Sequence, residues 1–449
     1  MKKLFLFLTF SVVSLSGICQ ASNKHQSEYA DFYRAEDLFD KKQYSNAIDE
    51  FSSFLEANKN SEDPIYIKAR YYHGICALKL YNNNAIDVLE EFIHDYPENV
   101  FVNEIYLKIA NSYFKKKSFK NSIKYYALVD DRALDTKKRS EFYFKMGYSN
   151  FEKGDRKKAK YAFEKIKDDS ASYSNPALYY YSHICYSDSA YQLALNGFNR
   201  LYKHPKYKAK AANYIIQIKH KFKDYEGVVS FYKNNFNNLD DLSADLIHLT
   251  GDSYYQLGKY FEAIPFLKSY NKSSATTKDD DYALGYCYYK TNRFYEAIRL
   301  FDNLLRKKDS LAQISFYQIG DCYLELNNLL SARVAFQKAA EMQFNKVIAE
   351  DAHYNYAVIS FKVDINPYNE SVKAFEGYIN QYPNSKRKEE VVQYLVNVYT
   401  STSNYDKALK SIENINKKDI NLKTVYQNIA YNYGVELFRK GRYNNAINA

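Results

Sequence analysis

The side chains that could do covalent or metal chemistry are few, and they are scattered along the 449-residue chain. The 5 cysteines and 8 histidines form no C-x-x-C pair and no H-E-x-x-H motif, two spacings that are typical of zinc sites. The sequence also lacks a G-x-S-x-G nucleophile motif and a glycine-rich phosphate loop. We therefore expect no catalytic residue, no metal site and no cofactor.

One cluster of carboxylates, Asp279 to Asp281 in the stretch "KDDDYALGY", has the chemistry to bind a cation. Acidic residues are also favourable in the first turn of a helix, because the N-terminal end of the helix dipole is positive. We interpret the cluster as the start of a helix and keep metal binding as the weaker alternative.

Tyrosine is the abundant aromatic residue, with 49 copies, whereas tryptophan is absent. A tyrosine side chain offers a large contact area at little entropy cost and ends in a polar hydroxyl, which suits partner recognition. Glycine (13) and proline (7) are scarce, so the composition favours helices packed on helices. What the tyrosines can do depends on the elements that position them.

A repeated spacing organises the chain. In "FYQIGDCYLELNNLLSARVAFQKAAE" (residues 316–341), the small residues Gly320 and Ala332 lie twelve apart, and Phe336 follows four residues later. The spacing recurs in twelve copies whose first small slots are 33 to 39 residues apart. We call this first slot the anchor and number the copies in order: Ala35, Gly74, Ala110, Gly147, Ser182, Ile215, Gly251, Gly285, Gly320, Ala357, Val396 and Gly434.

Each copy contains two stretches of helical period separated by a short turn that often carries Gly or Asn, such as Gly154, Gly258 and Asn292. Two antiparallel helices approach most closely where both side chains are small, and the large residue one turn later fills the space beside them. A lone hairpin would expose an apolar face that stacking on the next hairpin buries. The sequence therefore predicts an all-α solenoid of about twelve helical hairpins.

These residues resemble the tetratricopeptide repeat family, which has Gly or Ala at the anchor, Tyr three later, Ala twelve later and Phe or Tyr sixteen later. "IGDCYLELNNLLSARVAFQKA" carries every slot, and "LGYCYYKTNRFYEAIRLF" and "TGDSYYQLGKYFEAIPFL" carry nearly all of them. The resemblance covers about residues 28–449 and implies a right-handed superhelix with a concave groove. We assign residues 22–449 to the solenoid. Its twelfth copy is incomplete and uncapped, so we expect a longer native protein.

The copies depart from the family pattern in three ways. Most gaps exceed the usual 34 residues, from which we expect longer second helices. The sixth copy lacks a small anchor at Ile215, and the tenth has a longer turn, "KVDINPYNES", that contains Pro367. In "DYPENV" and "QYPNSK", the proline after tyrosine should end the second helix.

The repeat also predicts where four cysteines lie. Cys76, Cys287 and Cys322 come two residues after an anchor, and Cys185 comes three after. First helices of neighbouring repeats are about 8–10 Å apart, beyond the ~7 Å limit between the Cα atoms of a disulfide. We therefore expect free, buried thiols that pack as small apolar side chains.

The N-terminal stretch "MKKLFLFLTFSVVSLSGICQASNKHQ" has two lysines, a short apolar run and then small residues up to Ala21. This layout predicts a secretory signal peptide over residues 1–21, and no later run is long enough to span a membrane. We expect export to the periplasm, or association with the outer membrane, of a Gram-negative bacterium. A lipid anchor at Cys19 is less favoured, because the preceding Ile18 is bulky.

The charge pattern argues against nucleic acid as a partner. Removal of the leader with Lys2 and Lys3 would change the net charge from +10 to +8, that is, 61 bases against 53 acids. The charges are interspersed and form no long basic block, which is typical of a solvated surface.

In the family, the first-helix residues three before, one after and four after the anchor line the concave groove. Carried over to copies five, eight, nine and ten, the resemblance implies a partner-binding set: Tyr179, His183, Tyr186, Tyr282, Tyr286, Tyr289, Tyr317, Asp321, Tyr354 and Phe361, with Leu324 and Val358 in the remaining slots. The alternative is that tyrosine occupies these slots for packing alone. The lysine–asparagine clamp with which some family members hold a C-terminal carboxylate is not assembled, since Asn111 and Asn397 stand alone in that slot.

The sequence thus favours a non-catalytic scaffold that binds protein or peptide partners. Glycan binding through the tyrosines, to peptidoglycan or an exported polysaccharide, is the alternative, and the absence of tryptophan argues mildly against it. An enzyme would need a catalytic domain beyond residue 449. The oligomeric state is left open.

Overall fold

The computed structural model describes residues 29–449 apart from 60–61, 273–275, 364–369, 402–404 and 414–419. The proposed leader, Cys19 and the turn around Pro367 lie outside these segments. All regular secondary structure in the described segments is helical. The helices fall into two compact units, which divide between Ala212 and Asn213.

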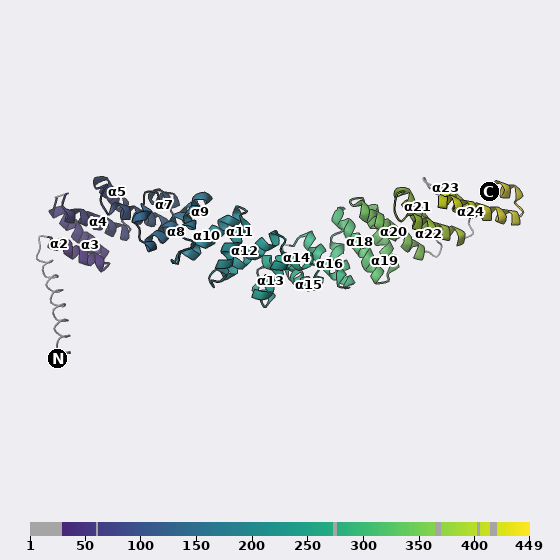
Figure 1. Ribbon diagram of the computed structural model, residues 1–449, viewed down its shortest axis with the longest axis horizontal. Helices are drawn as coiled ribbons and strands as arrows, with labels where there is room; N and C mark the ends of the chain where they lie inside the picture. Colours follow the sequence, from purple (N-terminus) through teal and green to yellow (C-terminus); the bar gives the residue numbers. More distant parts are fainter. Residues whose placement is uncertain (1–28, 60–61, 273–275, 364–369, 402–404, 414–419) are drawn as a thin grey trace, which may run out of the picture. The chain divides into compact units, whose positions relative to one another are not determined.

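In the N-terminal unit the helices follow one another in pairs (Figure 1): α2 (Ala30–Asp40), α3 (Tyr44–Ala57), α4 (Pro64–Lys79), α5 (Ala85–Asp95), α6 (Val102–Lys115), α7 (Phe119–Tyr126), α8 (Thr136–Glu152), α9 (Arg156–Glu164), α10 (Ser174–Ser187) and α11 (Tyr191–Tyr202). A short 3₁₀ helix, Asp131–Ala133, links α7 to α8. Helix α12 (Lys208–Lys221) crosses the division between the units.

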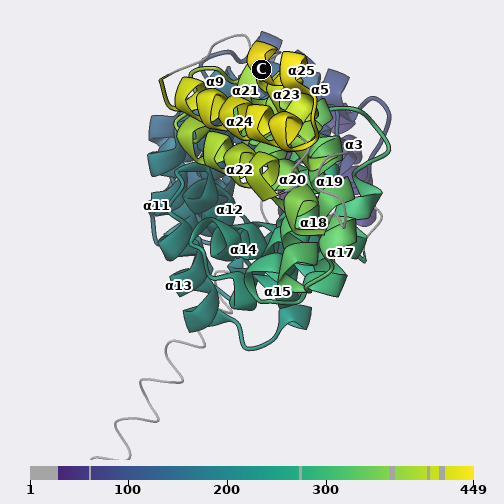
Figure 2. The ribbon, with the colours of Figure 1, turned by 90° about the vertical axis from the view of Figure 1, so that its right-hand side faces the viewer.

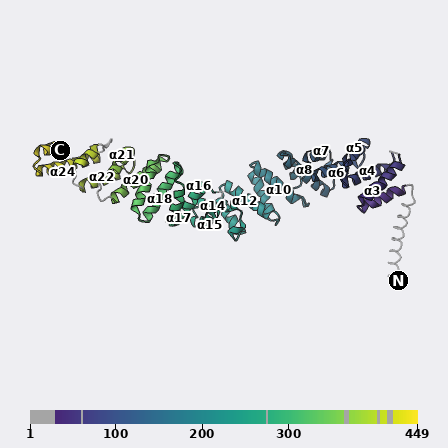
Figure 3. The same ribbon diagram turned by 180° about the vertical axis from the view of Figure 1, so that it is seen from behind.

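The C-terminal unit continues the pairing, as Figure 3 shows from behind: α13 (Tyr225–Asn235), α14 (Ala244–Gln256), α15 (Tyr260–Tyr270), α16 (Lys278–Lys290), α17 (Phe294–Asn303), α18 (Ser310–Glu325), α19 (Leu329–Glu341), α20 (Lys346–Val363), α21 (Ser371–Gln381), α22 (Lys388–Ser401), α23 (Tyr405–Glu413), α24 (Ile420–Arg439) and α25 (Tyr443–Asn448). A 3₁₀ helix, Leu239–Asp241, precedes α14. The last pair, α24 and α25, faces the viewer in Figure 2.

Each copy in the sequence corresponds to one helix pair, in which the first helix has an even number and the second an odd one. The sixth copy forms its pair, α12 and α13, although Ile215 fills its anchor, and this isoleucine is fully buried. From α2 to α11 and from α13 to α25, each helix contacts the next helix along the chain. The predicted all-α solenoid of hairpins is confirmed.

The anchor makes room for the large residue of the second helix. A Cβ added to Gly320 would lie 2.8 Å from Cζ of Phe336, and one added to Gly147 would lie 2.8 Å from Cε1 of Phe163. Both phenylalanines are completely buried. The small anchor therefore lets the phenylalanine ring of the same hairpin pack against the backbone of the first helix. The contact at the anchor is thus between a small residue and a ring, and not only between two small residues as expected.

Every described turn inside a hairpin has one residue in the left-handed backbone region, with φ between 55° and 82°: Lys42, Tyr81, Lys117, Gly154, Ser189, Lys223, Gly258, Asn292, Asn327 and Gly441. In the ninth copy, the amide of Asn327 donates to Leu324 O at 2.9 Å, and the amide of Asn328 donates to Tyr323 O at 2.8 Å. These bonds satisfy the last carbonyl groups of the first helix, as in a Schellman turn.

The predictions for the cysteines and for the acidic cluster are confirmed. Cys76, Cys185, Cys287 and Cys322 are free and buried. The cluster at Asp279 to Asp281 lies in the first turn of α16, where Asp280 and Thr277 form a capping box.

The second helices are not lengthened. Helix α8 has 17 residues and α9 has 9, and α20 has 18 whereas α21 has 11. The extra residues lie in longer first helices and in the links between hairpins, such as the 3₁₀ helix Asp131–Ala133. The prolines act as expected, since α5 ends at Asp95 and α21 at Gln381, just before the Tyr-Pro pairs.

Substituting the anchor Gly320→Ala should destabilise the C-terminal unit by about 1–2 kcal/mol, because the added methyl group meets the buried Phe336 ring. This net figure already includes the higher helix propensity of alanine, which offsets part of the cost. Gly434→Ala is the matched control, because a Cβ there meets only the carbonyl oxygen of Ala446 at 3.4 Å. Thermal unfolding followed by circular dichroism measures both. Equal midpoints for the two variants would contradict the packing role of the anchor.

Substituting Lys117→Gly should stabilise the N-terminal unit by about 0.5–1 kcal/mol, because glycine adopts the left-handed conformation without a Cβ clash. The neighbouring Lys116→Gly loses the same charge at a φ of −77°, where glycine brings only an entropic cost. The first variant should raise the unfolding midpoint and the second should lower it. A rise for both variants would show that the loss of positive charge, and not the backbone, is responsible.

Candidate functional site

The ten residues expected to contact a partner all lie on first helices and are half-buried. Tyr179, His183 and Tyr186 belong to α10 in the N-terminal unit. The others belong to the C-terminal unit: Tyr282, Tyr286 and Tyr289 on α16, Tyr317 and Asp321 on α18, and Tyr354 and Phe361 on α20. The two sets are therefore described separately. We call the side of the first helices that carries these slots the first-helix face.

On α10 the rings stack along the helix. Tyr179 lies parallel to His183 with ring centres 6.4 Å apart, and the ammonium of Lys210 lies 5.5 Å from the centre of the Tyr179 ring. Tyr186 packs edge-on against Tyr191 at 5.7 Å. Burial lowers the pKa of His183, so its imidazole is neutral at pH 7 and acts here as a flat aromatic surface.

On α16 the tyrosines form a connected row. Tyr286 lies 6.1 Å from Tyr282 and 5.9 Å from Tyr289, measured between ring centres. Tyr255 and Tyr260 of the preceding hairpin lie 6.1 Å and 5.7 Å from Tyr286. The row therefore joins two repeats.

Helices α18 and α20 add acids to the tyrosines. The hydroxyl of Tyr317 donates a hydrogen bond to Asp351, which also pairs with Arg387 at 2.5 Å. Burial raises the pKa of Asp321 to about 6, and the nearby carboxylate of Asp351 adds to the effect. Asp321 is thus a carboxylate that titrates close to neutral pH.

The remaining predicted residues lie further along α20. The hydroxyl of Tyr354 donates to Glu390 at 2.6 Å, and the Arg387 guanidinium lies 4.4 Å from the centre of the Tyr354 ring. Phe361 packs against Tyr394 at 5.6 Å. Both side chains thus also connect repeat ten to repeat eleven, which means that packing accounts for part of their burial.

The sequence prediction missed the seventh repeat, where His248, Asp252 and Tyr255 occupy the same three slots on α14. His248 lies 2.7 Å from Asp280 of the next first helix, and Asp252 lies 2.6 Å from His220 of the preceding one. The slot positions relative to Gly251 carried enough signal to find these residues. Their partners 32 residues away could not be recognised without the stacking of the repeats.

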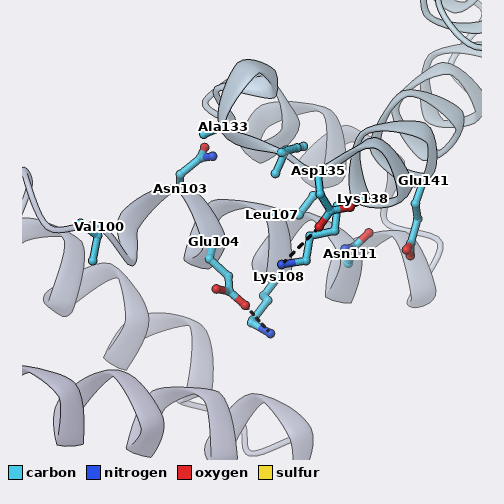
Figure 4. Close-up of a pocket in the computed structure, with 11 residues that line it drawn as sticks. Val100, Asn103, Glu104, Leu107, Lys108, Asn111, Ala133, Asp135, Lys138 and Glu141 are labelled. Atoms are coloured by element: carbon cyan, nitrogen blue, oxygen red, sulfur yellow. Dashed lines mark hydrogen bonds and ion pairs between the residues drawn. The ribbon is translucent and has the colours of Figure 1, made fainter.

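A pocket of about 390 Å³ was also missed (Figure 4). It lies between α6 and α8, and it is lined by Val100, Asn103, Glu104, Leu107, Lys108, Asn111, Ala133, Leu134, Asp135, Lys138 and Glu141. None of the ten predicted residues lines it. Asn111, which stood alone in the clamp slot, accepts hydrogen bonds from Lys145 at 2.9 Å and from Tyr126 at 2.8 Å.

No group of three or more His, Cys, Asp or Glu side chains in the described segments is arranged to hold a metal ion. None of the helices in those segments is both long and apolar enough to cross a membrane.

Comparison with known proteins identifies the repeat. Residues 141–171 and 282–346 each match a family model described as tetratricopeptide repeat. The chain therefore contains tetratricopeptide repeats, and the same anchor spacing and hairpin geometry continue in the other copies. Stacked repeats of this kind present extended binding surfaces, and the two matches support a protein–protein interaction scaffold. A comparison with curated proteins found no match.

Similar solved structures include YrrB, described as a TPR protein with an unusual peptide-binding site, with 17% identity and a TM-score of 0.36, covering 43% of this chain and 98% of YrrB. The C-terminal part of a TPR repeat-containing protein from Cytophaga hutchinsonii has 17% identity and a TM-score of 0.38. The match covers 55% of this chain and 98% of that protein chain. A tetratricopeptide repeat protein from Parabacteroides merdae has 11% identity and a TM-score of 0.33. The match covers 57% of this chain and 98% of that protein chain.

Substituting Asp321→Asn should raise the unfolding midpoint at pH 7.5. The pKa of this carboxyl is about 6 in the folded chain, against an ordinary value of 3.8, so its charge destabilises the fold above pH 6 and has no effect well below pH 4. The gain should therefore shrink as the pH falls from 6 to 4. Glu262→Gln, at an exposed acid on α15, is the charge-matched control and should give no such gain. A pH-independent difference would contradict the raised pKa.

Proposed function

We propose that the chain is a non-catalytic scaffold of the bacterial cell envelope that holds protein or peptide partners along a tyrosine-rich groove on the first-helix face. The observation that carries this proposal is the row of half-buried tyrosines on α16, which joins Tyr255 and Tyr260 of the preceding hairpin. Half-buried rings with polar tips give large contacts at little entropy cost, as protein interfaces require.

The envelope location rests on the N-terminal sequence. Lys2 and Lys3, the apolar run after them and the small residues up to Ala21 support secretion with cleavage near residue 21. Export without a lipid anchor is the preferred form of the proposal, because Ile18 precedes Cys19. N-terminal sequencing of the mature protein from a fractionated host cell tests both points.

A glycan is the second candidate ligand, and the same tyrosines support it, because aromatic rings can stack on the apolar faces of sugars. The absence of tryptophan makes it the weaker candidate. The two candidates are separated by asking whether the molecule held at the first-helix face is protein or carbohydrate.

A photo-reactive benzoylphenylalanine placed at Tyr286 should crosslink to a protein when the full chain is produced in its native host. The matched control is the same group at Phe261, which is 77% exposed on the second helix α15 of the same unit and lies outside the row. We expect protein adducts at position 286 at several times the level at position 261, measured by mass spectrometry of the purified adducts.

Equal crosslinking at both positions would contradict a partner site on the first-helix face. Adducts to cell-wall glycan at position 286, together with retention of the intact chain on purified peptidoglycan that Tyr286→Ala abolishes, would establish the second candidate instead.

A further inference from the structure

The acidic side chains around α18 differ in whether they have a counter-charge. Asp351 pairs with Arg387 at 2.5 Å. Asp321 is half-buried and forms no salt bridge within the described segments; it lies close enough to the Tyr289 hydroxyl and the Lys290 ammonium to interact with both. A half-buried carboxylate that lacks a salt bridge is costly, and a cation that bound directly beside it would remove part of that cost.

A cation of the chain itself already shows what the neighbouring rings accept. The ammonium of Lys290 lies 5.3 Å from the centre of the Tyr286 ring and 5.2 Å from the centre of the Tyr289 ring. Both distances are within the range of a cation–π interaction. Lys290 is exposed at the end of α16, so its ammonium can leave the rings for solvent.

The charge of this part of the first-helix face is opposite to that of the whole chain, which is +10. Residues six before, one after and five after each anchor lie on the same side of a helix as the tyrosine slots. In repeats seven to ten these positions carry acids at Asp245, Asp252, Asp279, Asp321, Glu325 and Asp351, and bases at Lys290 and Lys362. The acidic excess favours a basic ligand.

We propose that Tyr286, Tyr289, Tyr317 and Asp321 form a cation site that binds a lysine or arginine side chain from an extended segment of a partner protein. The proposal rests on the proposed function and specifies the chemistry of the partner. The incoming cation takes the place of the Lys290 ammonium on the two rings of α16, and its charge lies next to Asp321. Lys290 therefore competes with the partner for the site.

The geometry favours a side-chain cation over other ligands. An anion would face Asp321 and Asp351 and would be repelled. A metal ion is not favoured, because the described residues here include no group of three or more metal-binding side chains. Ammonium and guanidinium groups, in contrast, bind to aromatic faces and carboxylates together.

The test uses the full chain without its leader and three blocked eight-residue peptides that alternate glycine with lysine, glutamate or glutamine. Calorimetric titration at low salt should show binding of the lysine peptide and not of the other two. Asp321→Asn should weaken this binding roughly tenfold. Lys290→Gln should strengthen it roughly threefold or more, whereas Lys290→Arg, which keeps a cation at this position, should not.

Two exposed residues of α15 serve as charge-matched controls. Glu262→Gln removes one acid and Lys268→Gln removes one base away from the cation site, and neither should change the affinity by more than about twofold. The gain expected for Lys290→Gln cannot arise from misfolding, so it tests the cation site independently of Asp321→Asn.

Equal effects of the site and control variants, or tighter binding of the glutamate peptide, would overturn the cation site. The scaffold function would stand in that case if the crosslinker at Tyr286 still captured a protein. The reverse outcome is that the crosslinker captures no protein, whereas the lysine peptide binds and its affinity responds to Lys290 and Asp321. That result would overturn the scaffold function and support the cation site. Binding of a neutral glycan such as chitohexaose in place of the lysine peptide would overturn both.

Discussion

The packing of one large residue against a small anchor is the interaction on which the rest of the molecule depends. Phe336 reaches the backbone of α18 because Gly320 has no side chain, and the contact recurs between Phe301 and Gly285 one repeat earlier. This contact sets the distance between the two helices of a hairpin and the rotation of the first helix. The rotation in turn decides which side chains, such as Tyr286, are half-buried beside neighbouring first helices.

The same period governs the turn that follows. A residue seven after the anchor adopts the left-handed conformation, and glycine or asparagine fills this position at Gly154, Gly258 and Asn292. Lys42 and Lys117 adopt it as well, at a cost that the favourable packing of the hairpin outweighs. Local backbone preference is therefore subordinate to the packing of the repeat, which explains why the sixth hairpin forms around Ile215.

What could be predicted from the sequence is what one repeat contains. The hairpins, the buried Cys287 and the helix start at Asp280 follow from positions within a single copy, and all were predicted. The length of the second helices was predicted wrongly, because the interval between anchors does not tell whether extra residues lengthen a helix or a link. Contacts between copies, such as Asn111 with Lys145, were out of reach, because they join residues 34 positions apart.

The proposed cation site also depends on contacts between copies, and this dependence bears on how a repeat protein acquires a specific ligand. Tyr289, Asp321 and Asp351 come from three successive first helices, so no single repeat contains the arrangement. The anchor contact that builds each hairpin involves none of these three residues. A half-buried acid such as Asp321 lowers the stability of the fold, and functional sites are where proteins retain such costs. The stacking that buries the core thus also brings together, from neighbouring repeats, charges and rings that no helix alone could assemble.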